Sequence, residues 1–126
     1  MSFRRTVAGL IFAGSVVLAS PALAHPKLVS SQPAAQAAVG ATNRVALTFS
    51  EQLMPQMSGM EVTMTGMPGM PNHTMKMTGF RTTVEGGKTL VATFARPLMA
   101  GTYRVQWHAV SADTHRIQGT IDFTVR

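Results

Sequence analysis

Residues 44–50 read RVALTFS, and their side chains alternate between apolar and polar or small. A period of two residues is typical of a β-strand with one face in the core and the other toward solvent. Ala46 and Thr48 share the side of the strand that carries Arg44. The opposite side, predicted to face the core, holds the large apolar residues: Val45, Leu47 and Phe49.

Comparable runs surround this stretch and are separated by turn-forming residues. Gly86 and Gly87 stand between two of them and indicate a two-residue hairpin, and no segment has a convincing helical pattern. With a possible first strand at residues 27–30, about seven short strands predict an all-β, immunoglobulin-like or Greek-key sandwich. The other expected strands are residues 60–65, 80–85, 88–95, 102–110 and 120–125.

The first residues have the pattern of a sorting signal. Arg4 and Arg5 precede an apolar-to-small run over residues 7–20, which is shorter than the roughly 20 residues of a membrane span. Residues 21–24 (PALA) then supply the small-x-small pattern of a cleavage site. We expect residues 1–24 to be a cleavable signal peptide and residues 25–126 to be one exported domain; an uncleaved N-terminal anchor is the alternative.

Charge and cysteine content exclude several functions. The chain has 11 Lys and Arg against 5 Asp and Glu, but its basic residues are scattered singly, so no nucleic-acid partner is expected. The chain contains no cysteine. Disulfides and thiolate metal sites, including blue-copper centres, are therefore excluded.

Methionine is concentrated in one segment. Pro and Gly residues make a helix implausible there, so the spacing M-x-x-M-x-x-M at Met64, Met67 and Met70 is assigned to a strand end and a loop. With His73 and Met75 following, the pattern favours a metal site, because soft thioethers select Cu(I). Flexible packing or an apolar surface is the alternative. The segment contains eight of the ten methionines: Met54, Met57, Met60, Met64, Met67, Met70, Met75 and Met77.

A second candidate site depends on the predicted cleavage. His25 would become the first residue, and its α-amine and imidazole together would chelate Cu(II). Pro26 has no backbone N–H to act as the next ligand, so other ligands must come from elsewhere in the fold. Asp113 and His115 are candidates because an i, i+2 spacing in an extended chain places both side chains on one side. Glu51 follows a predicted strand and is another candidate; a solvated, hydrogen-bonded turn is the alternative for Asp113 and His115.

These motifs together resemble the CopC/PcoC family of periplasmic copper-resistance proteins. The resemblance rests on His25-Pro26, on Phe49-Ser50-Glu51, and on residues 63–70 (TMTGMPGM) and 110–115 (VSADTH). It implies a seven-stranded, cupredoxin-like barrel or sandwich with two copper sites at opposite ends. The implied Cu(II) ligands are His25, Asp113 and His115, with Glu51 as an additional carboxylate. The implied Cu(I) ligands are Met64, Met67, Met70, His73 and Met75, although Met77 competes with Met75.

The expected function is therefore a periplasmic copper carrier and not an enzyme. The resemblance suggests a CopD-type inner-membrane copper-import protein or a periplasmic multicopper oxidase as a partner. The rival function is a copper monooxygenase with an N-terminal histidine, which needs an open copper position and a broad aromatic surface. One Trp and one Tyr provide little of that surface. A sandwich used only for protein interaction leaves the methionine run unexplained.

Overall fold

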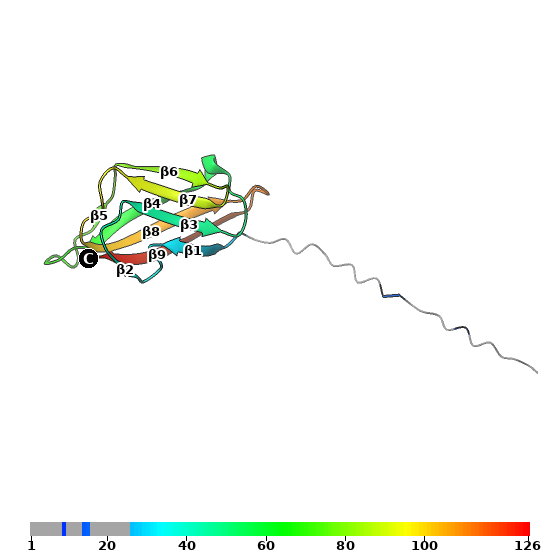
Figure 1. The fold of residues 1–126 in the computed structure, drawn as a ribbon, viewed down its shortest axis with the longest axis horizontal. Coiled ribbons are helices and arrows are strands. Elements are labelled where there is room, and N and C mark those ends of the chain that lie inside the picture. Colours follow the sequence, from blue (N-terminus) through cyan, green and yellow to red (C-terminus); the bar gives the residue numbers. More distant parts are fainter. Residues whose placement is uncertain (1–8, 10–13, 16–25) are drawn as a thin grey trace, which may run out of the picture.

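A computed structural model describes residues 9, 14–15 and 26–126. Residues 26–126 form two β-sheets packed against each other (Figure 1). Four strands form one sheet in the order β1 (Leu28–Gln32), β3 (Arg44–Phe49), β7 (Thr89–Phe94) and β6 (Phe80–Glu85). Five form the other in the order β2 (Ala38–Val39), β9 (Arg116–Val125), β8 (Gly101–Val110), β4 (Gly59–Gly66) and β5 (Met75–Lys76). A short 3₁₀ turn, η1 (Pro55–Met57), is the only helical element among the described residues. The predicted all-β sandwich is confirmed.

The strands differ from the predicted ones in number and length. Residues 26–126 form nine strands, because the two-residue strands β2 and β5 carry too short a pattern to be recognised. β9 begins at Arg116, before the predicted residue 120, because it pairs with β8 over its whole length. The hairpin at Gly86 and Gly87 is real, but Glu85 pairs with Thr89, so its loop has three residues and not two. Both glycines have positive φ, 60° and 78°, which suits residues without a Cβ.

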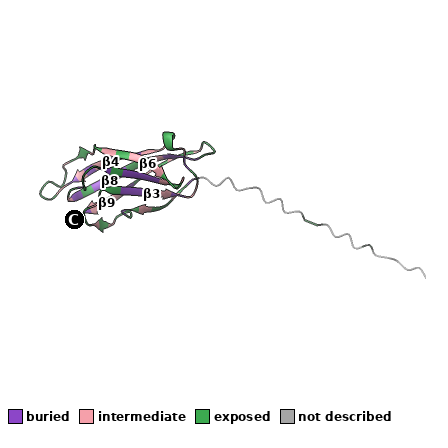
Figure 2. Ribbon diagram, turned by 45° about the horizontal axis from the view of Figure 1, so that its top comes forward, coloured by how far each residue is buried: buried purple, intermediate pink, exposed green. Residues whose placement is uncertain are grey.

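The core lies between the two sheets and is built from the alternate residues of their long strands (Figure 2). β4 buries Met60, Val62 and Met64, and β8 buries alternate residues from Tyr103 to Ala109. Two pairs of aromatic rings pack within this core. Phe49 meets Trp107 edge-on with centroids 5.0 Å apart, and Tyr103 stacks on Phe123 at 5.4 Å. Such contacts add specific geometry to the burial of apolar surface.

One residue of the opening stretch departs from the alternation. Ala46 is buried although it faces away from the core, and its cross-strand partner Val91 is completely buried. Arg44 on β3 reaches Glu85 on β6 with a nitrogen–oxygen distance of 2.7 Å, so this ion pair spans the intervening β7 on that outer face. Ala46, a small residue on the central strand β3, is therefore covered by neighbouring side chains on the outer face and is not exposed to solvent.

The connections place two groups of residues at opposite ends of the sandwich. The β8–β9 connection lies at the end where the described body begins at Pro26, and the β4–β5 connection lies at the far end (Figure 1). Among the described residues, no helix has the length and apolar character to cross a membrane.

Candidate metal sites

The Asp-x-His sequence forms a tight turn between β8 and β9. The Ser111 amide donates to the His115 carbonyl at 2.9 Å, and the Thr114 amide donates to the Ser111 carbonyl at 2.8 Å. Thr114 has φ of 73°, a left-handed conformation that reverses the chain within this short connection. The turn brings the side chains of Asp113 and His115 together, with Asp113 Oδ2 2.8 Å from His115 Nδ1.

The Asp113 carboxylate is fixed and charged. The Ser111 hydroxyl donates a hydrogen bond to Oδ1, and His115 bonds the other oxygen. The Ser111 hydrogen bond, followed by that of His115, lowers the pKa of Asp113 to about 2. In the neutral tautomer that donates Nδ1–H to this carboxylate, Nε2 of His115 carries the lone pair that a metal takes. Sequence reasoning missed Ser111, whose only signal is its position two residues before the aspartate.

Two other segments converge on this turn. The Ala112 amide donates to the Gln52 carbonyl at 3.0 Å, and the Ser50 amide donates to the Lys27 carbonyl at 2.9 Å. Glu51 lies between these two contacts in the sequence, so Lys27, Glu51 and the Asp113 turn share one end of the sandwich. Within residues 26–126, no three His, Asp or Glu side chains gather closely enough to hold a metal ion together. His25, the remaining predicted ligand, lies outside the described residues.

The distribution of ion pairs sets this end apart. Within the described part of the chain, Glu51 and Asp113 are the only acidic side chains without a Lys or Arg ion pair. They therefore leave negative charge at this end that no Lys or Arg ion pair neutralises. The other three of the five acidic residues pair on the sheet surfaces: Glu61 with Lys76, Glu85 with Arg44 and Asp122 with Arg104.

At the opposite end, the predicted methionine loop begins inside the sheet. β4 continues to Gly66, and Met64 is completely buried in the core, so it belongs to the strand and not to the loop that follows. Its cross-strand partner on β5 is Met75, whose residue is 40% exposed. Directly opposed residues share a face with Cβ atoms about 4.5–5.5 Å apart, so these two methionines are neighbours across the sheet. Met77 packs against the core, so Met75 presents the more accessible thioether of the two.

The next two methionines close a turn. Met67 and Met70 exchange backbone hydrogen bonds at 3.0 and 2.9 Å, around Pro68 and Gly69. Gly69 has φ of 80°, as the third residue of a type II turn requires. Met70 is half exposed, and the His73 amide donates to its carbonyl at 3.2 Å. The turn therefore holds two thioethers and places the His73 backbone beside them.

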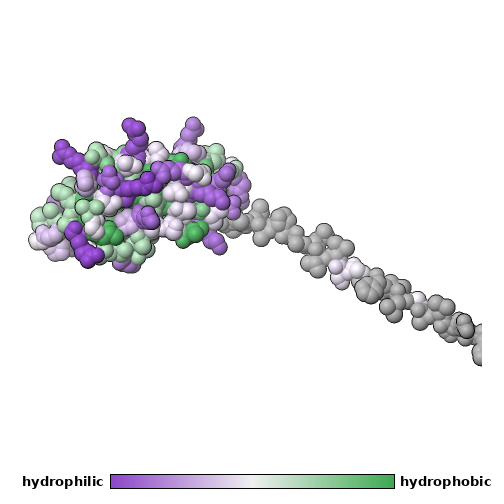
Figure 3. Space-filling view, viewed as in Figure 1, coloured by the Kyte–Doolittle hydropathy of each residue, from purple (hydrophilic) through white to green (hydrophobic). Residues whose placement is uncertain are grey.

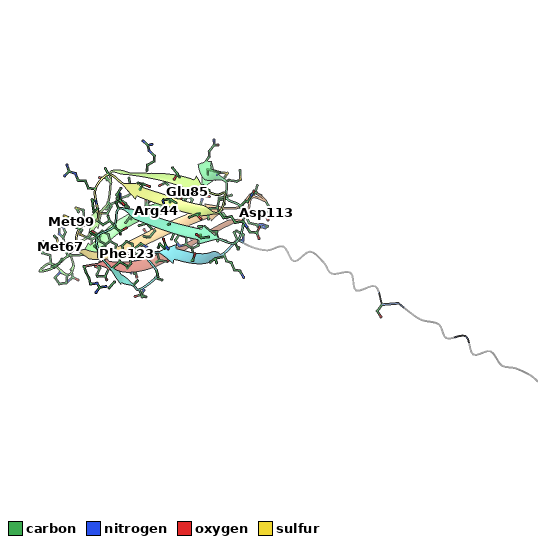
Figure 4. The ribbon with its side chains drawn as sticks, in the orientation of Figure 1. Arg44, Met67, Glu85, Met99, Asp113 and Phe123 are labelled. Atoms are coloured by element: carbon green, nitrogen blue, oxygen red, sulfur yellow. The ribbon has the colours of Figure 1, made fainter. Side chains whose placement is uncertain are left out.

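The two groups are far apart on the molecule. Figure 4 shows Asp113 at one end of the sandwich and Met67 and Met99 at the other. Met99 was not predicted as a site residue because it lies outside the methionine-rich segment, in the connection between β7 and β8. In the space-filling view, pale green marks moderately apolar surface at the methionine end (Figure 3).

Comparison with known proteins gives one consistent result. The family model of the CopC domain matches residues 28–126. Copper resistance protein C of Pseudomonas syringae pv. tomato is 45% identical over 100% of both chains, and that of Xanthomonas campestris pv. juglandis is 41% identical over 99% of this chain and 98% of its own. The crystal structure of PcoC, a methionine-rich copper resistance protein from Escherichia coli, superposes with a TM-score of 0.74. It is 44% identical and covers 82% of this chain and 100% of its own.

Proposed function

Since this chain belongs to the CopC family, we propose that it is a copper-binding protein of copper resistance that carries the metal in the periplasm. One observation supports this function above the others. Asp113, an oxygen donor beside the His115 imidazole, lies at one end of the sandwich, and the thioether of Met67 lies at the other (Figure 4). Their chemistries suit the two oxidation states of copper, because thioethers prefer Cu(I) and imidazole and carboxylate groups bind Cu(II).

The Cu(II) ligands in this proposal are the amine and imidazole of His25 together with Asp113 and His115. Glu51 is the additional carboxylate. Two observations support this ligand set. The Asp113 carboxylate is charged and is oriented by the Ser111 hydroxyl, and Glu51 lies beside the same turn. Pro26, which follows His25 in the sequence, lies at the same end of the fold as this turn. Signal-peptide cleavage after residue 24 supplies the free amine.

The Cu(I) ligands in this proposal are Met64, Met67, Met70, His73 and Met75. Met67 and Met70 are paired by their turn, and Met64 and Met75 are paired across β4 and β5. Met64 is the buried member and Met70 the most exposed, so the set extends from the core to the surface. Thioethers are neutral and need no deprotonation, so the methionines of this site can still bind copper in acid, where the His73 imidazole cannot.

A carrier is favoured over a copper monooxygenase by the placement of the aromatic residues. Trp107 and Tyr103 are both buried in the core. Among the described phenylalanines, Phe49, Phe94 and Phe123 are buried too, and Phe80 is partly buried against the core. The described surface therefore offers no broad aromatic platform for a polysaccharide. In the carrier function, copper passes to a partner such as a CopD-type inner-membrane protein or a periplasmic multicopper oxidase.

The test is copper stoichiometry in each oxidation state, measured on the exported protein. We expect Cu(II) and Cu(I) to bind together without displacing each other, and we expect no peroxide-dependent oxidation of polysaccharide. Displacement of one ion by the other would show a single shared site. Oxidised sugar products formed by the copper-loaded protein would favour the monooxygenase instead.

A further inference from the structure

Few large apolar residues are exposed in the described structure, and most of those that are exposed are methionines. Met99 is 55% exposed, more than Met70 or Met75. It belongs to the connection between β7 and β8, far along the sequence from the methionine-rich segment. Within residues 26–126, the exposed large apolar residues are Val29, Met57, Met70, Met75 and Met99.

The backbone of Met99 is held in place, so its exposure is not that of a frayed loop. Leu98 is buried in the core, and its amide donates to the Thr42 carbonyl at 2.8 Å. The Tyr103 hydroxyl donates to the Met99 carbonyl at 2.6 Å. Burial raises the pKa of Tyr103, so that hydroxyl stays protonated and able to donate. Leu98 thus anchors the segment in the core and Met99 extends its thioether outward.

This segment lies against the turn that Met67 and Met70 close, which is called the methionine turn below. Thr102 pairs with Gly66 at the end of β4, and Gly101 packs directly on the same residue. A Cβ at position 101 would lie 2.5 Å from the Gly66 carbonyl oxygen and 3.6 Å from the Met67 Cα. The missing side chain at Gly101 therefore allows the chain that carries Met99 to approach Met67 closely. Figure 4 shows both methionines at the same end of the sandwich.

We propose that Met99 supplies a further thioether ligand to Cu(I) at this end, which rests on the Cu(I) function proposed above. A methionine side chain has three rotatable bonds, so Met99 can turn its sulfur toward a metal bound at the 67–70 turn. Among the proposed thioether donors, Met64 lies wholly inside the core. Met99 offers an exposed donor two residues before Gly101, the residue that packs against the turn.

The experiment compares two exposed methionines. Met99→Leu is the test, and Met57→Leu is the matched control, because Met57 is 52% exposed and belongs to η1, at the Asp113 end. Cu(I) affinity is measured anaerobically by competition with a chromophoric Cu(I) chelator. Sulfur ligands are counted by X-ray absorption at the copper edge. We expect Met99→Leu to weaken Cu(I) binding by about tenfold or more, the scale seen when metal-site residues are altered. It should also reduce the sulfur count, and Met57→Leu should change neither.

Three other results would contradict either this inference or the proposed Cu(I) function. If the parent binds Cu(I) and Met99→Leu keeps its affinity and sulfur count, Met99 is not a ligand and only this inference is lost. Equal weakening by Met57→Leu would also overturn it, because the effect would not depend on position. A parent protein that binds no Cu(I) would overturn the proposed Cu(I) function itself.

Discussion

Gly119 shows how a single missing side chain shapes the core near the Asp113 turn. A Cβ at this position would lie 2.6 Å from Cζ2 of Trp107, its cross-strand partner, and 3.0 Å from Cε2. The indole therefore lies flat against bare backbone. Its Nε1 is buried and has no hydrogen-bond partner within the described residues, so the ring is held by packing alone.

Gly119→Ala is consequently expected to destabilise the fold by about 1–3 kcal/mol, the usual cost of overpacking a filled core. Urea unfolding followed by circular dichroism measures the change. Gly40→Ala is the control, because a Cβ at position 40 meets nothing within 4 Å, and it should stay within about 0.5 kcal/mol of the parent. Equal stability of the two variants would mean that the Trp107 ring moves aside freely.

Asp113 gives a prediction in acid. Its pKa is lowered from 3.8 to about 2 in the folded protein, so the unfolded chain takes up this proton more readily than the folded one. The resulting stabilisation is present in full above about pH 4 and is lost as the pH falls through about 2. The stability difference between the parent and Asp113→Asn, measured without metal, should therefore shrink between pH 5 and pH 2. A difference that stays constant over this range would mean that the Ser111 and His115 hydrogen bonds do not favour the charged carboxylate.

Among the elements, β4 shows what a sequence pattern can and cannot provide. Alternation correctly placed Met60, Val62 and Met64 on one face of a strand. The M-x-x-M spacing, however, crosses the end of that strand. Whether Met64 belongs to the core or to the loop depends on the partner β8, whose Thr102 extends the pairing to Gly66. Pairing between strands that are distant in the chain produces no pattern in the local sequence, and the two-residue strand β5 is too short to produce one.

The methionine elements can be tested together. Met64→Leu, Met67→Leu and Met70→Leu combined keep apolar bulk, and each hydrophobic swap of similar volume costs less than about 1.5 kcal/mol, so the fold should survive. This triple variant is expected to lose Cu(I) binding and to retain Cu(II), because leucine offers no sulfur donor. Competition assays in both oxidation states provide the measurement, and thermal unfolding checks the fold. Unchanged Cu(I) affinity would make these three methionines packing or surface residues.

For the whole molecule, the Cu(II) prediction depends on the first residue of the exported chain. Mass spectrometry of the exported protein should find His25 as its N-terminus. Adding one residue before His25 should then weaken Cu(II) binding strongly, because the α-amine moves away from the imidazole, while Cu(I) binding stays unchanged. A different natural N-terminus, or full Cu(II) affinity in the extended protein, would remove His25 from the site.

The overall class of fold was accessible from the sequence because β3, β4, β7 and β8 each carry a period of two residues. The order of the strands was not, since it depends on pairings between distant segments such as β3 with β7. The same limit applies to the candidate sites. Asp113 and His115 are neighbours in sequence and were predicted together. The convergence of Lys27, Ser50 and Gln52 around Glu51 arises only from the folded chain.

The methionine turn and the Asp113 turn are separate connections on one framework, and that arrangement bears on how such proteins can diverge. Shortening the β4–β5 connection leaves the pairing of β8 with β9 intact, and altering the β8–β9 connection leaves the Met67–Met70 turn intact. Connections tolerate insertion and deletion better than the strands that they join. A lineage can therefore discard the sulfur donors, or remodel the carboxylate and imidazole donors, as independent modules, so that each metal preference is inherited or lost on its own.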